Sequence, residues 1–528
     1  MITKKTKVSI AVALCSATIS LSAYANQSQP NIILFLVDDM GWTDTSVQFA
    51  PERVPANDFF RTPSMESLAK TGIKFTQAYS HAVCSPSRIS LMTGQNPVRH
   101  HSSNWIMLPS GDAQNGDWGP NKSPRNWRQE GIQPDDITLP KQLKKAGYHT
   151  IHVGKAHFSA VGTKGADPKT LGFDVNIAGH SAGAPASYLG EKNFGNDIPV
   201  TNGYPQGVPG LEEFHGKPVH LTDVLTQKAE NEIDSAITEG KPFFLNMAYY
   251  AVHTPIEAHP RFIDNYRGKI YKDTQIAVPE IEARYASLVE GMDTSVGEII
   301  QHIKDRGIAE NTLIVFTSDN GGLSGHTRQT TPRGTELNTH NYPLKSGKGS
   351  AYEGGIRVPY IVSWGTPNPL NPLQKKIPIK SNSVSNAQVL IDDLFPSFIK
   401  VADGEIPEGY NIDGIDVSSL WSSPDENIER PIIMHYPHIW GPIGPGYEPN
   451  STMRLGDYKV IYFYNSKTWE MYNLKNDIGE NFNLAKSEPK KLASMAEKLK
   501  DELKKMNVQW PVNRLTNKDE PLLLPKEI

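Results

Sequence analysis

Two pairs of oxygen-bearing side chains follow mostly apolar runs that are typical of buried strands. Asp38 and Asp39 come directly after one such run, and Asp319 and Asn320 come directly after another. Ligands bind at the carboxyl ends of parallel strands, so the four side chains can converge. Their hard oxygens suit Ca²⁺ or Mg²⁺, and no Cys or His pair at zinc spacing accompanies them. Taken alone, either pair could simply be part of a turn without binding a ligand.

Cys84 is the one thiol expected in the mature chain. The sequence has two cysteines, and Cys15 lies in an N-terminal segment that we expect to be removed, so an internal disulfide is excluded. A lone cysteine is most often a small buried hydrophobic residue. Cys84, however, opens the sequence CSPSRISLMTG, in which Arg88 provides a guanidinium that could neutralise a bound anion.

Three further candidates lie in loops that are rich in glycine or follow a predicted strand. Lys155 and His157 belong to a Gly-Lys-x-His loop. Lys348 lies between glycines, which let the backbone approach a ligand, while its ammonium group supplies a charge for an oxyanion. His149 and His152 fall inside the predicted strand, and we expect them to be packed or exposed without a catalytic role.

His253 follows the apolar run at 242–250, where its ring could act as a general acid or base. His259 lies close by and is its main rival for that role. Lys345 is likewise the alternative to Lys348, although an exposed lysine is usually only solvated.

The segment that begins at Cys84 resembles the signature of the sulfatase family, in which C-x-P-x-R is followed by Leu and Thr-Gly. Five motifs occur in the family's order between about residues 30 and 359. In that family a maturation enzyme oxidises the cysteine to formylglycine. The resemblance implies one calcium ion per chain, with magnesium as the alternative, bound by five residues: Asp38, Asp39, Cys84 as formylglycine, Asp319 and Asn320.

The same resemblance assigns roles in the hydrolysis of a sulfate monoester. The catalytic residues would be Cys84, Arg88, Lys155, His157, His253 and Lys348. The three cations would neutralise the sulfate, and a hydroxyl of the formylglycine hydrate would attack sulfur while Asp319 or another base accepts its proton. His253 would protonate the leaving alcohol, and His157 would deprotonate the second hydroxyl to release sulfate.

A parallel sheet has to position these residues. We expect an α/β fold with a large, mostly parallel central sheet flanked by helices, alkaline-phosphatase-like, and a smaller C-terminal α+β subdomain. Strands are predicted at 31–37, 148–153, 242–250 and 312–318, and helices over 288–303 and 387–403. Beyond them, short strands are predicted at 432–435, 459–464 and 469–472, followed by a helix over 489–506.

The chain is expected to have three parts: a signal peptide at 1–25, a sulfatase catalytic domain at 26–425 and a C-terminal antiparallel-sheet subdomain at 426–528. A basic start, a short apolar stretch and an Ala-Tyr-Ala site are typical of a secretory signal, and the stretch is short of the ~20 residues of a membrane span. We therefore expect a periplasmic or secreted protein without stable membrane insertion.

Composition excludes several function classes. The 528 residues are 38% hydrophobic, which allows a large core and excludes a disordered chain. Lys plus Arg is 53 against 57 for Asp plus Glu, a net charge of -4, so no nucleic-acid partner is expected.

The substrate hypothesis depends on loops that mix aromatic with polar side chains, a combination that suits sugar rings and their hydroxyls. These loops are 100–105, 126–128 and 438–440, together with the stretch 326–345, which holds Arg328, Arg333, His340 and Tyr342. Any one of their tryptophans could instead pack beneath its loop. We expect a sulfated carbohydrate, with a carrageenan-type galactan first and a glycosaminoglycan or ulvan second.

Two other functions stay open at this point. A phosphomonoester or phosphodiester hydrolase of the same superfamily could use residue 84 on a different ester, although alkaline phosphatases bind two zinc ions through added histidines. A non-catalytic, calcium-dependent glycan-binding protein would instead keep Cys84 as a thiol.

Overall fold

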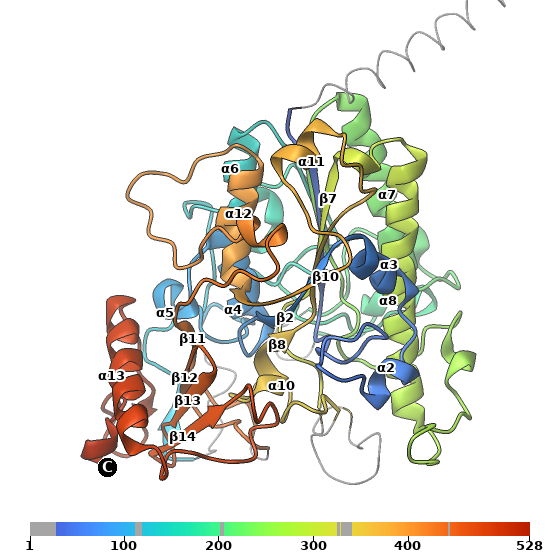
Figure 1. The fold of residues 1–528 in the computed structure, drawn as a ribbon. Helices are drawn as coiled ribbons and strands as arrows, with labels where there is room; N and C mark the ends of the chain where they lie inside the picture. The colour runs from blue at the N-terminus through green and yellow to red at the C-terminus, as the bar shows by residue number, and fades with distance from the viewer. Residues whose placement is uncertain (1–27, 111–118, 201–204, 325–327, 329–339, 442–443) are drawn as a thin grey trace, which may run out of the picture.

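A nine-stranded sheet forms the centre of the part of the chain that the structure describes (Figure 1). The computed structural model describes residues 28–110, 119–200, 205–324, 328, 340–441 and 444–528. The strands of this sheet are β1 (Asn31–Val37), β2 (Ile73–Tyr79), β4 (His149–Gly154), β5 (Val175–Ile177), β6 (Phe243–Ala248), β7 (Thr312–Ser318), β8 (Arg357–Val358), β9 (Tyr360–Trp364) and β10 (Ser383–Leu390).

The strand order is β10-β2-β9-β7-β1-β6-β4-β5, with β8 paired to β2. The pairs β10–β2, β7–β1, β1–β6, β6–β4 and β4–β5 are parallel, whereas β9 runs antiparallel to both β2 and β7. The sheet is therefore mostly parallel, and the predicted α/β fold is confirmed.

β1 lies in the middle of the sheet because its apolar side chains can be buried on both faces. All seven of its residues are buried, and Leu34 is paired with Val315 of β7 on one side and Asn246 of β6 on the other. Successive side chains pack on opposite faces, into two separate apolar cores. Asp38 and Asp39 therefore leave the sheet at its carboxyl edge, between β7 and β6.

Helices cover both faces of the sheet (Figure 1). One face carries α3 (Pro63–Thr71), α7 (Leu221–Glu239) and α8 (Glu280–Asp305), and the other carries α4 (Cys84–Thr93), α6 (Leu139–Lys145) and α12 (Leu394–Val401). Shorter helices in the connections are α2 (Pro55–Phe59), α5 (Pro97–His100), α10 (Glu353–Ile356) and α11 (Pro372–Lys376). α8 confirms the helix predicted ahead of the strand at 312–318.

The prediction of one helix over 387–403 is wrong in its first part. Residues up to Leu390 form β10, a 3₁₀ turn follows, and only Leu394–Val401 is the helix α12. β10 pairs in parallel with β2, a segment roughly 300 residues earlier in the chain. Pairing at that separation leaves no local periodicity, so the apolar residues of a strand and a helix were merged into one pattern.

A smaller antiparallel sheet lies beside the central one (Figure 1). Its order is β11-β12-β13-β14, formed by β11 (Ile432–Tyr436), β12 (Asn450–Leu455), β13 (Tyr458–Phe463) and β14 (Thr468–Asn473). α13 (Pro489–Lys505) packs on it through Leu492, Leu499 and Leu503. We call residues 426–528 the C-terminal subdomain. A further pair, β3 (Asn121–Lys122) and β15 (Val512–Asn513), joins this region to an earlier loop.

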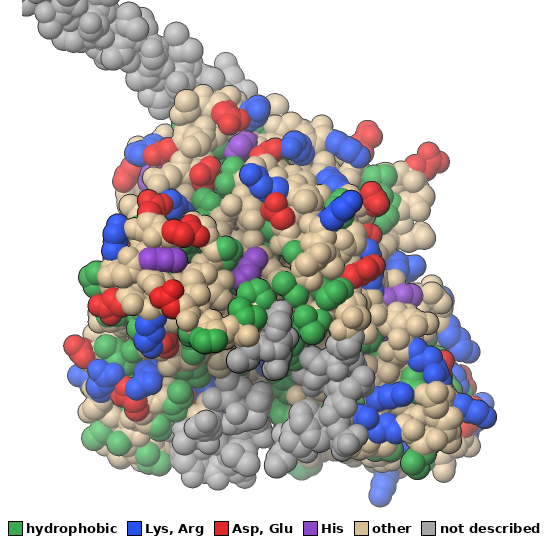
Figure 2. Space-filling model, turned by 180° about the vertical axis from the view of Figure 1, so that it is seen from behind, with side chains coloured by type: hydrophobic (Ala, Val, Ile, Leu, Met, Phe, Trp, Pro, Cys, Tyr) green, Lys and Arg blue, Asp and Glu red, His purple; other side chains and the backbone are tan. Residues whose placement is uncertain are grey.

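Acidic and basic side chains are intermixed over the face that Figure 2 shows, with no large area of one sign. In the described part of the chain, no helix is both long enough and apolar enough to span a bilayer. The predicted signal peptide at 1–25 lies outside the described residues.

Candidate active site

Cys84 is the first residue of α4, just beyond the end of β2. The turn before it is held by Ser80, whose hydroxyl donates to the carbonyl of Ser318 (2.7 Å), and by Ser87, whose hydroxyl accepts from the amide of His81 (2.9 Å). The Cys84 side chain is only 2% exposed. A helix N-terminus carries partial positive charge, so this position favours an anion.

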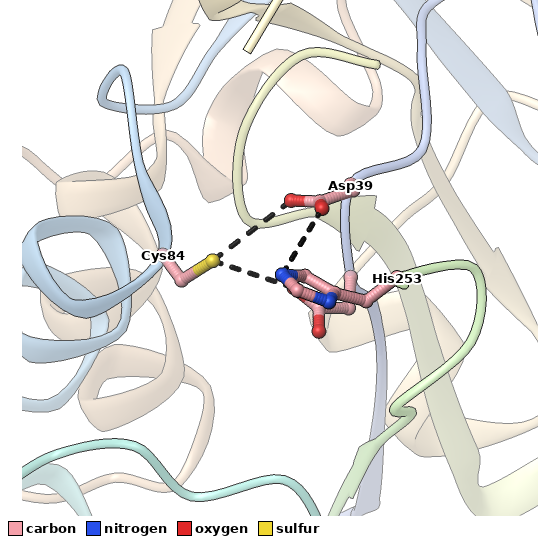
Figure 3. A group of neighbouring side chains, drawn as sticks. Asp39, Cys84 and His253 are labelled. Atoms are coloured by element: carbon pink, nitrogen blue, oxygen red, sulfur yellow. Dashed lines mark hydrogen bonds and ion pairs between the residues drawn. The ribbon is translucent and has the colours of Figure 1, made fainter. Parts of the chain in front are cut away.

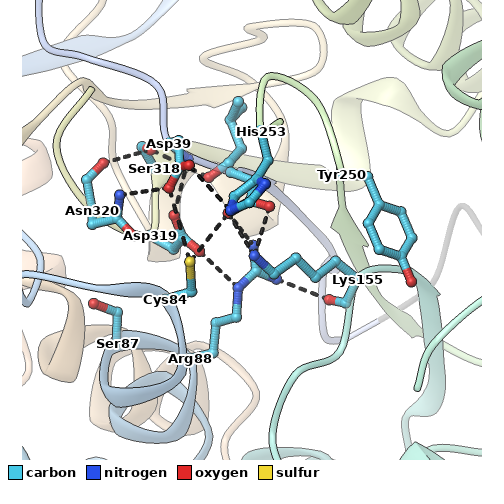
Figure 4. Close-up of polar contacts among 12 residues, drawn as sticks. Asp39, Cys84, Ser87, Arg88, Lys155, Tyr250, His253, Ser318, Asp319 and Asn320 are labelled. Atoms are coloured by element: carbon cyan, nitrogen blue, oxygen red, sulfur yellow. Dashed lines mark hydrogen bonds and ion pairs between the residues drawn. The ribbon is translucent and has the colours of Figure 1, made fainter. Parts of the chain in front are cut away.

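Two aspartates that directly follow β1 face Cys84, and each is paired with a lysine from a different loop. Figure 4 shows Asp39, Cys84 and Lys155 in this cluster. Lys155 Nζ lies 2.7 and 2.6 Å from the two carboxylate oxygens of Asp38. Lys348 Nζ lies 2.6 Å from Asp39 Oδ1 and 3.2 Å from Cys84 Sγ. Cys84 Sγ is 3.5 Å from Asp38 Oδ1 and 3.8 Å from Asp39 Oδ1.

Asp319 and Asn320 complete the cluster from the end of β7. Arg88 Nε donates to Asp319 Oδ2 at 2.7 Å, and Asn320 Nδ2 donates to Asp39 Oδ1 at 2.8 Å. Within the described residues, Arg88 Nη2 and Asn320 Oδ1 are buried without a hydrogen-bond partner. A buried polar atom without a partner is costly, so these two atoms indicate that the cluster is built for ligands.

The charges in the cluster shift one another's pKa values. Burial alone would raise the pKa of Asp39, but Lys348, His253 and Lys155 outweigh it and hold that pKa below its ordinary value. Burial would lower the pKa of Lys348, but Asp39 and the neighbouring acids raise it above its ordinary value. Asp39 is therefore an anion and Lys348 a cation.

The other two carboxylates differ from each other. Burial raises the pKa of Asp38 well above its ordinary value, despite Lys155. For Asp319 burial acts in the same direction, but Arg88 and Lys155 outweigh it and lower the pKa. Three carboxylates and three cations thus share one buried volume, and Asp38 is the member whose charge most needs a further positive neighbour.

His157 is held as a proton acceptor. Its Nε2 lies 2.7 Å from the carbonyl oxygen of Ile106; since a carbonyl only accepts, Nε2 carries the proton and Nδ1 the lone pair. Nδ1 is buried and has no partner among the described residues. Burial lowers the pKa of His157 well below its ordinary value, so the ring is neutral. A Cβ at Gly183 would lie 2.5 Å from this ring, so glycine is needed there.

His253 presents its Nε2 to the same cluster (Figure 3). Nδ1 lies 2.9 Å from the carbonyl oxygen and 3.1 Å from the hydroxyl of Thr254, which leaves Nε2 directed at Asp39 Oδ2, 3.4 Å away. Burial and the nearby Lys348 lower the pKa of His253. Nε2 is therefore the nitrogen that can exchange a proton with a group bound beside Cys84.

The donor set fits a hard cation. Asp38, Asp39, Cys84 and His253 each offer one ligand atom, and these atoms lie within 4.8 Å of one another. The Asn320 side chain, whose Nδ2 lies 2.8 Å from Asp39 Oδ1, adds an Oδ1 that is buried without a hydrogen-bond partner among the described residues. An oxygen-rich set with one carboxylate of raised pKa suits Ca²⁺ or Mg²⁺. His253 was expected in this site as a proton donor, but its place among the possible ligand atoms was not expected from the sequence.

The cluster opens into a pocket of about 180 Å³. Its lining residues are Cys84, Trp105, His157, Gly183, Ala184, Gln206, His253, Lys348 and Trp440. Charged groups gather at Cys84, whereas Trp105, Gly183, Ala184 and Trp440 provide apolar surface. Gly183, Ala184 and Gln206 have no sequence signal that could have identified them.

His259 and Lys345, the two alternatives considered from the sequence, do not reach the cluster around Cys84. His259 is fully buried, with Nε2 3.4 Å from Asp223, and its ring packs on His220 at 4.0 Å between centroids. Lys345 Nζ lies 3.9 Å from the centroid of the Tyr352 ring and donates to a backbone carbonyl. His253 and Lys348 are thus the members of each pair that reach the site.

His149 and His152, both on β4, lie apart from the cluster. His152 is fully buried, where its Nδ1 accepts from Asn246 Nδ2 at 3.0 Å. Its ring packs against Phe158 and Phe173. Neither histidine lines the pocket.

Of the aromatic residues in the predicted substrate loops, some line the pocket and others do not. Trp105 and Trp440 line the pocket, but Trp127 is 6% exposed and packs against His438. Arg328, expected near the substrate, is instead buried and donates to Glu282 Oε1 at 2.8 Å, so it does not contact the pocket. His340 is also buried and Tyr342 is exposed, whereas Arg333 lies outside the described residues.

The loop that carries Asp39 is held by contacts from residues far away in the sequence, which sequence motifs could not reveal. Asp39 has a left-handed φ of 62°, which is uncommon for a residue with a side chain. Its amide donates to Asp319 Oδ1 (3.2 Å), and the Tyr285 hydroxyl lies 2.7 Å from Asp44 Oδ2 and 3.3 Å from the Asp39 carbonyl. Strain of this kind is typical of functional sites.

Comparison with known proteins identifies sulfatase-family sequence over most of the chain. The sulfatase family model matches residues 30–404, and the model for the C-terminal region of N-sulphoglucosamine sulphohydrolase matches residues 347–509. A sulfatase from Formosa agariphila is 29% identical over 515 residues, which cover 88% of this chain and 86% of the relative.

Two further relatives act on named carbohydrates or bind them. N-acetylgalactosamine-6-sulfatase of Rattus norvegicus is 30% identical over 470 residues, 86% of this chain and 76% of the relative. The crystal structure of Ps i-CgsB in complex with k-i-k-neocarrahexaose is 27% identical with a TM-score of 0.67, covering 91% of this chain and 94% of that one. The chain therefore belongs to the sulfatase family and is a sulfuric ester hydrolase.

Proposed function

We propose that the protein removes sulfate from a sulfated polysaccharide or oligosaccharide, with residue 84 as formylglycine. One observation carries the proposal: the Cys84 side chain lines a pocket while facing Lys348 and the carboxylates of Asp38 and Asp39. A formylglycine at this position would supply a hydrated aldehyde, whose hydroxyl attacks the sulfur of the ester.

The positive side chains would bind the sulfate group. Lys348 already lies 3.2 Å from the position-84 side chain, and Arg88 Nη2, 3.6 Å from Asp38 Oδ1, has no hydrogen-bond partner among the described residues. Lys155 adds a third charge. In a buried site such fixed charges act strongly on a developing negative charge, because no solvent has to reorganise.

Two histidines would move the protons. His253 Nε2 faces the cluster and would donate a proton to the leaving alcohol. His157 Nδ1 has a free lone pair and would accept a proton from the group at position 84 when sulfate is released. The carbonyl contacts of Thr254 and Ile106 hold the two rings in these orientations.

We propose calcium as the metal, held by Asp38, Asp39, Asp319, Asn320 and the side chain at position 84. The cation would supply positive charge next to the sulfate oxygens. A cation here would also compensate the buried charge of Asp38, and it would give a partner to Asn320 Oδ1, which has no hydrogen bond among the described residues. Magnesium has the same donor preference and is the alternative.

The substrate class rests on the pocket and on relatives. Trp105 and Trp440 provide aromatic wall surface next to the charged cluster, as a sugar ring with a sulfate requires. Ps i-CgsB was crystallised with k-i-k-neocarrahexaose, and other relatives are N-acetylgalactosamine-6-sulfatases. We therefore propose a carrageenan-type galactan first and a glycosaminoglycan or ulvan second.

The location and maturation of the protein follow from the N-terminal sequence and from Cys84. We propose that residues 1–25 direct export to the periplasm or the exterior, as the basic start and the Ala-Tyr-Ala site suggest. The conversion of Cys84 then requires a formylglycine-generating maturation enzyme as a partner.

Mass spectrometry of active enzyme tests the nucleophile. The peptide that holds residue 84 should have the mass of formylglycine, and Cys84→Ala should abolish turnover while the melting temperature and saccharide binding stay near the wild-type values. An unmodified thiol in fully active enzyme would show that the mechanism is wrong.

A desulfation screen across defined sulfated oligosaccharides, with ion chromatography of released sulfate, tests the substrate. Sulfate should be released from at least one galactan or glycosaminoglycan fragment. Turnover of a small aryl sulfate with every glycan untouched would refute the carbohydrate assignment, and two zinc ions per chain with release of phosphate would favour a phosphate ester hydrolase.

A further inference from the structure

We infer that Trp440 of the C-terminal subdomain is a specificity-determining residue that forms the wall against which the ring bearing the scissile sulfate packs. The inference rests on the proposed saccharide substrate and adds which part of the chain recognises the ring. Trp440 follows β11, and its side chain lines the same pocket as Cys84, His253 and Lys348.

The Trp440 ring lies against the loop that carries the sulfate-binding lysine. Lys348 Nζ is 5.5 Å from the ring centroid. Gly349, with a left-handed φ of 84°, packs under the ring so closely that a Cβ there would lie 2.1 Å from it. The Gly349 amide donates to the carbonyl of Ala82 (2.8 Å), two residues before Cys84. The indole is thus held next to both the nucleophile position and the lysine.

The backbone of the subdomain fixes the other side of the tryptophan. The Trp440 amide donates to the carbonyl of Tyr447 at 3.0 Å. Trp440 and Trp105 pack against a shared apolar cluster that includes Ile432 and Met434 of β11. The ring cannot shift without moving this cluster, so it forms a rigid surface, which loses little entropy when a ligand packs on it.

Buried charges hold the subdomain in register with the catalytic loop. Lys459 Nζ of β13 lies 3.0 Å from Glu353 Oε1, and Glu353 Oε2 accepts from the Tyr79 hydroxyl at 2.9 Å. Glu353 is five residues after Lys348, and Tyr79 is five residues before Cys84. The subdomain therefore contacts the two segments that carry the chemistry, and Trp440 has a fixed position relative to them.

The pocket separates two kinds of recognition. Charged groups bind the sulfate, whereas the tryptophans together with Gly183 and Ala184 offer apolar surface to carbon-bound hydrogens of a ring. Loss of Trp440 should weaken the ring contact in both the bound substrate and the transition state. The effect should then appear in KM more than in kcat.

The test measures sulfate release from a sulfated oligosaccharide by wild type, Trp440→Ala and Trp440→Phe, together with inhibition by inorganic sulfate. Trp440→Ala should raise KM by about five- to tenfold, with kcat changed by less than about threefold. Trp440→Phe should retain most of the affinity. The inhibition constant of inorganic sulfate should change by less than about twofold, because sulfate contacts only the charged groups.

Trp510→Phe is the matched control, since Trp510 packs on His435 and Tyr464 in the same subdomain and does not line the pocket. An unchanged KM in Trp440→Ala overturns the inference. An equal loss of affinity for inorganic sulfate also overturns it, because Trp440 would then act through Lys348. The same KM rise in Trp510→Phe would indicate a loosened subdomain instead. Wild type that desulfates no saccharide contradicts the proposed function itself.

Discussion

The molecule contains two buried clusters of charged side chains that differ in how completely they are paired. The active-site cluster holds Asp38, Asp39, Asp319, Arg88, Lys155 and Lys348. The second, which we call the junction cluster, holds Glu353, Glu480, Lys459, Arg357 and Arg454 and joins the catalytic sheet to the C-terminal subdomain.

In the junction cluster the acids have dense sets of partners. Glu353 accepts from Tyr79, Arg357 and Lys459, and Glu480 Oε2 accepts from the amide of Glu353 at 2.7 Å. The active-site cluster instead leaves Asn320 Oδ1 without a hydrogen-bond partner among the described residues, and Arg88 Nη2 has only a distant charge contact, 3.6 Å from Asp38 Oδ1. Glu480 Oε1 of the junction cluster also lacks a hydrogen bond there, but it lies 2.8 Å from Lys459 Nζ. The difference indicates that buried charge alone does not mark a functional site, whereas incomplete pairing beside a pocket does.

The largest effect is expected when the junction cluster loses its central cation. Lys459→Met should lower the free energy of unfolding by about 3–5 kcal/mol, because Glu353 and Glu480 are left buried without their shared partner. Chemical denaturation measures the loss. Adding Glu480→Gln to that variant should restore part of it, and a cost below about 1 kcal/mol for Lys459→Met would contradict the account.

Loss of a cation from the active-site cluster should affect activity more than stability. Lys348→Met should lower kcat by about 10²–10³-fold, because a charge that stabilises the transition state is removed. Its melting temperature should fall less than that of Lys459→Met, since the pocket admits water. Lys345→Met is the control, because Lys345 lies over the Tyr352 ring. Comparable activity losses in both variants would mean that the two lysines were assigned wrongly.

One source of the stability lost in acid should lie outside both clusters. Burial lowers the pKa of His435 on β11 to about 4, so this histidine is neutral in the folded protein. The unfolded chain binds its proton near pH 6.5; stability is therefore fully present above that pH and is lost as pH falls toward 4. The loss reaches about 3 kcal/mol. His435→Gln should reduce the drop in stability between pH 7 and 4, and an identical drop would refute this origin.

Metal removal should distinguish the clusters with the smallest effect on stability. A chelator should abolish activity and lower stability by about 2–3 kcal/mol, which corresponds to a metal present at about 100 times its Kd. In Lys459→Met the same chelator should lower the stability by the same amount, because the two clusters do not share residues. Activity that survives exhaustive chelation would contradict the metal assignment.

The strands that deliver the active site were predictable because their burial leaves a strong signal. β1, β6 and β7 are apolar runs in the sequence, and polar residues follow each of them at the carboxyl edge. β12 went unpredicted because its sequence, Asn450–Leu455, is largely polar although most of it is buried. Ser451 bonds with His435 and Tyr464, and Arg454 donates to Tyr79 and Gln77, which are partners that no local pattern records.

The same limit applies within the site. Spacing identified both Lys345 and Lys348 but could not choose between them, because the choice depends on a turn in which Ser346 and Gly349 adopt left-handed φ values of 66° and 84°. That turn sends one lysine over Tyr352 and the other to Asp39. The supporting role of Tyr285 also required the fold, since it lies roughly 250 residues from the loop it holds.

The late position of β10 in the chain bears on the timing of biosynthesis. β2, which leads into Cys84, pairs with β8, β9 and β10, and roughly 300 residues must be made after Cys84 before β10 exists. At about 5–20 residues per second this takes roughly 15–60 s. During that interval the segment around Cys84 lacks β10 as a sheet neighbour, so the proposed maturation enzyme would have access to a thiol that is only 2% exposed once folding is complete.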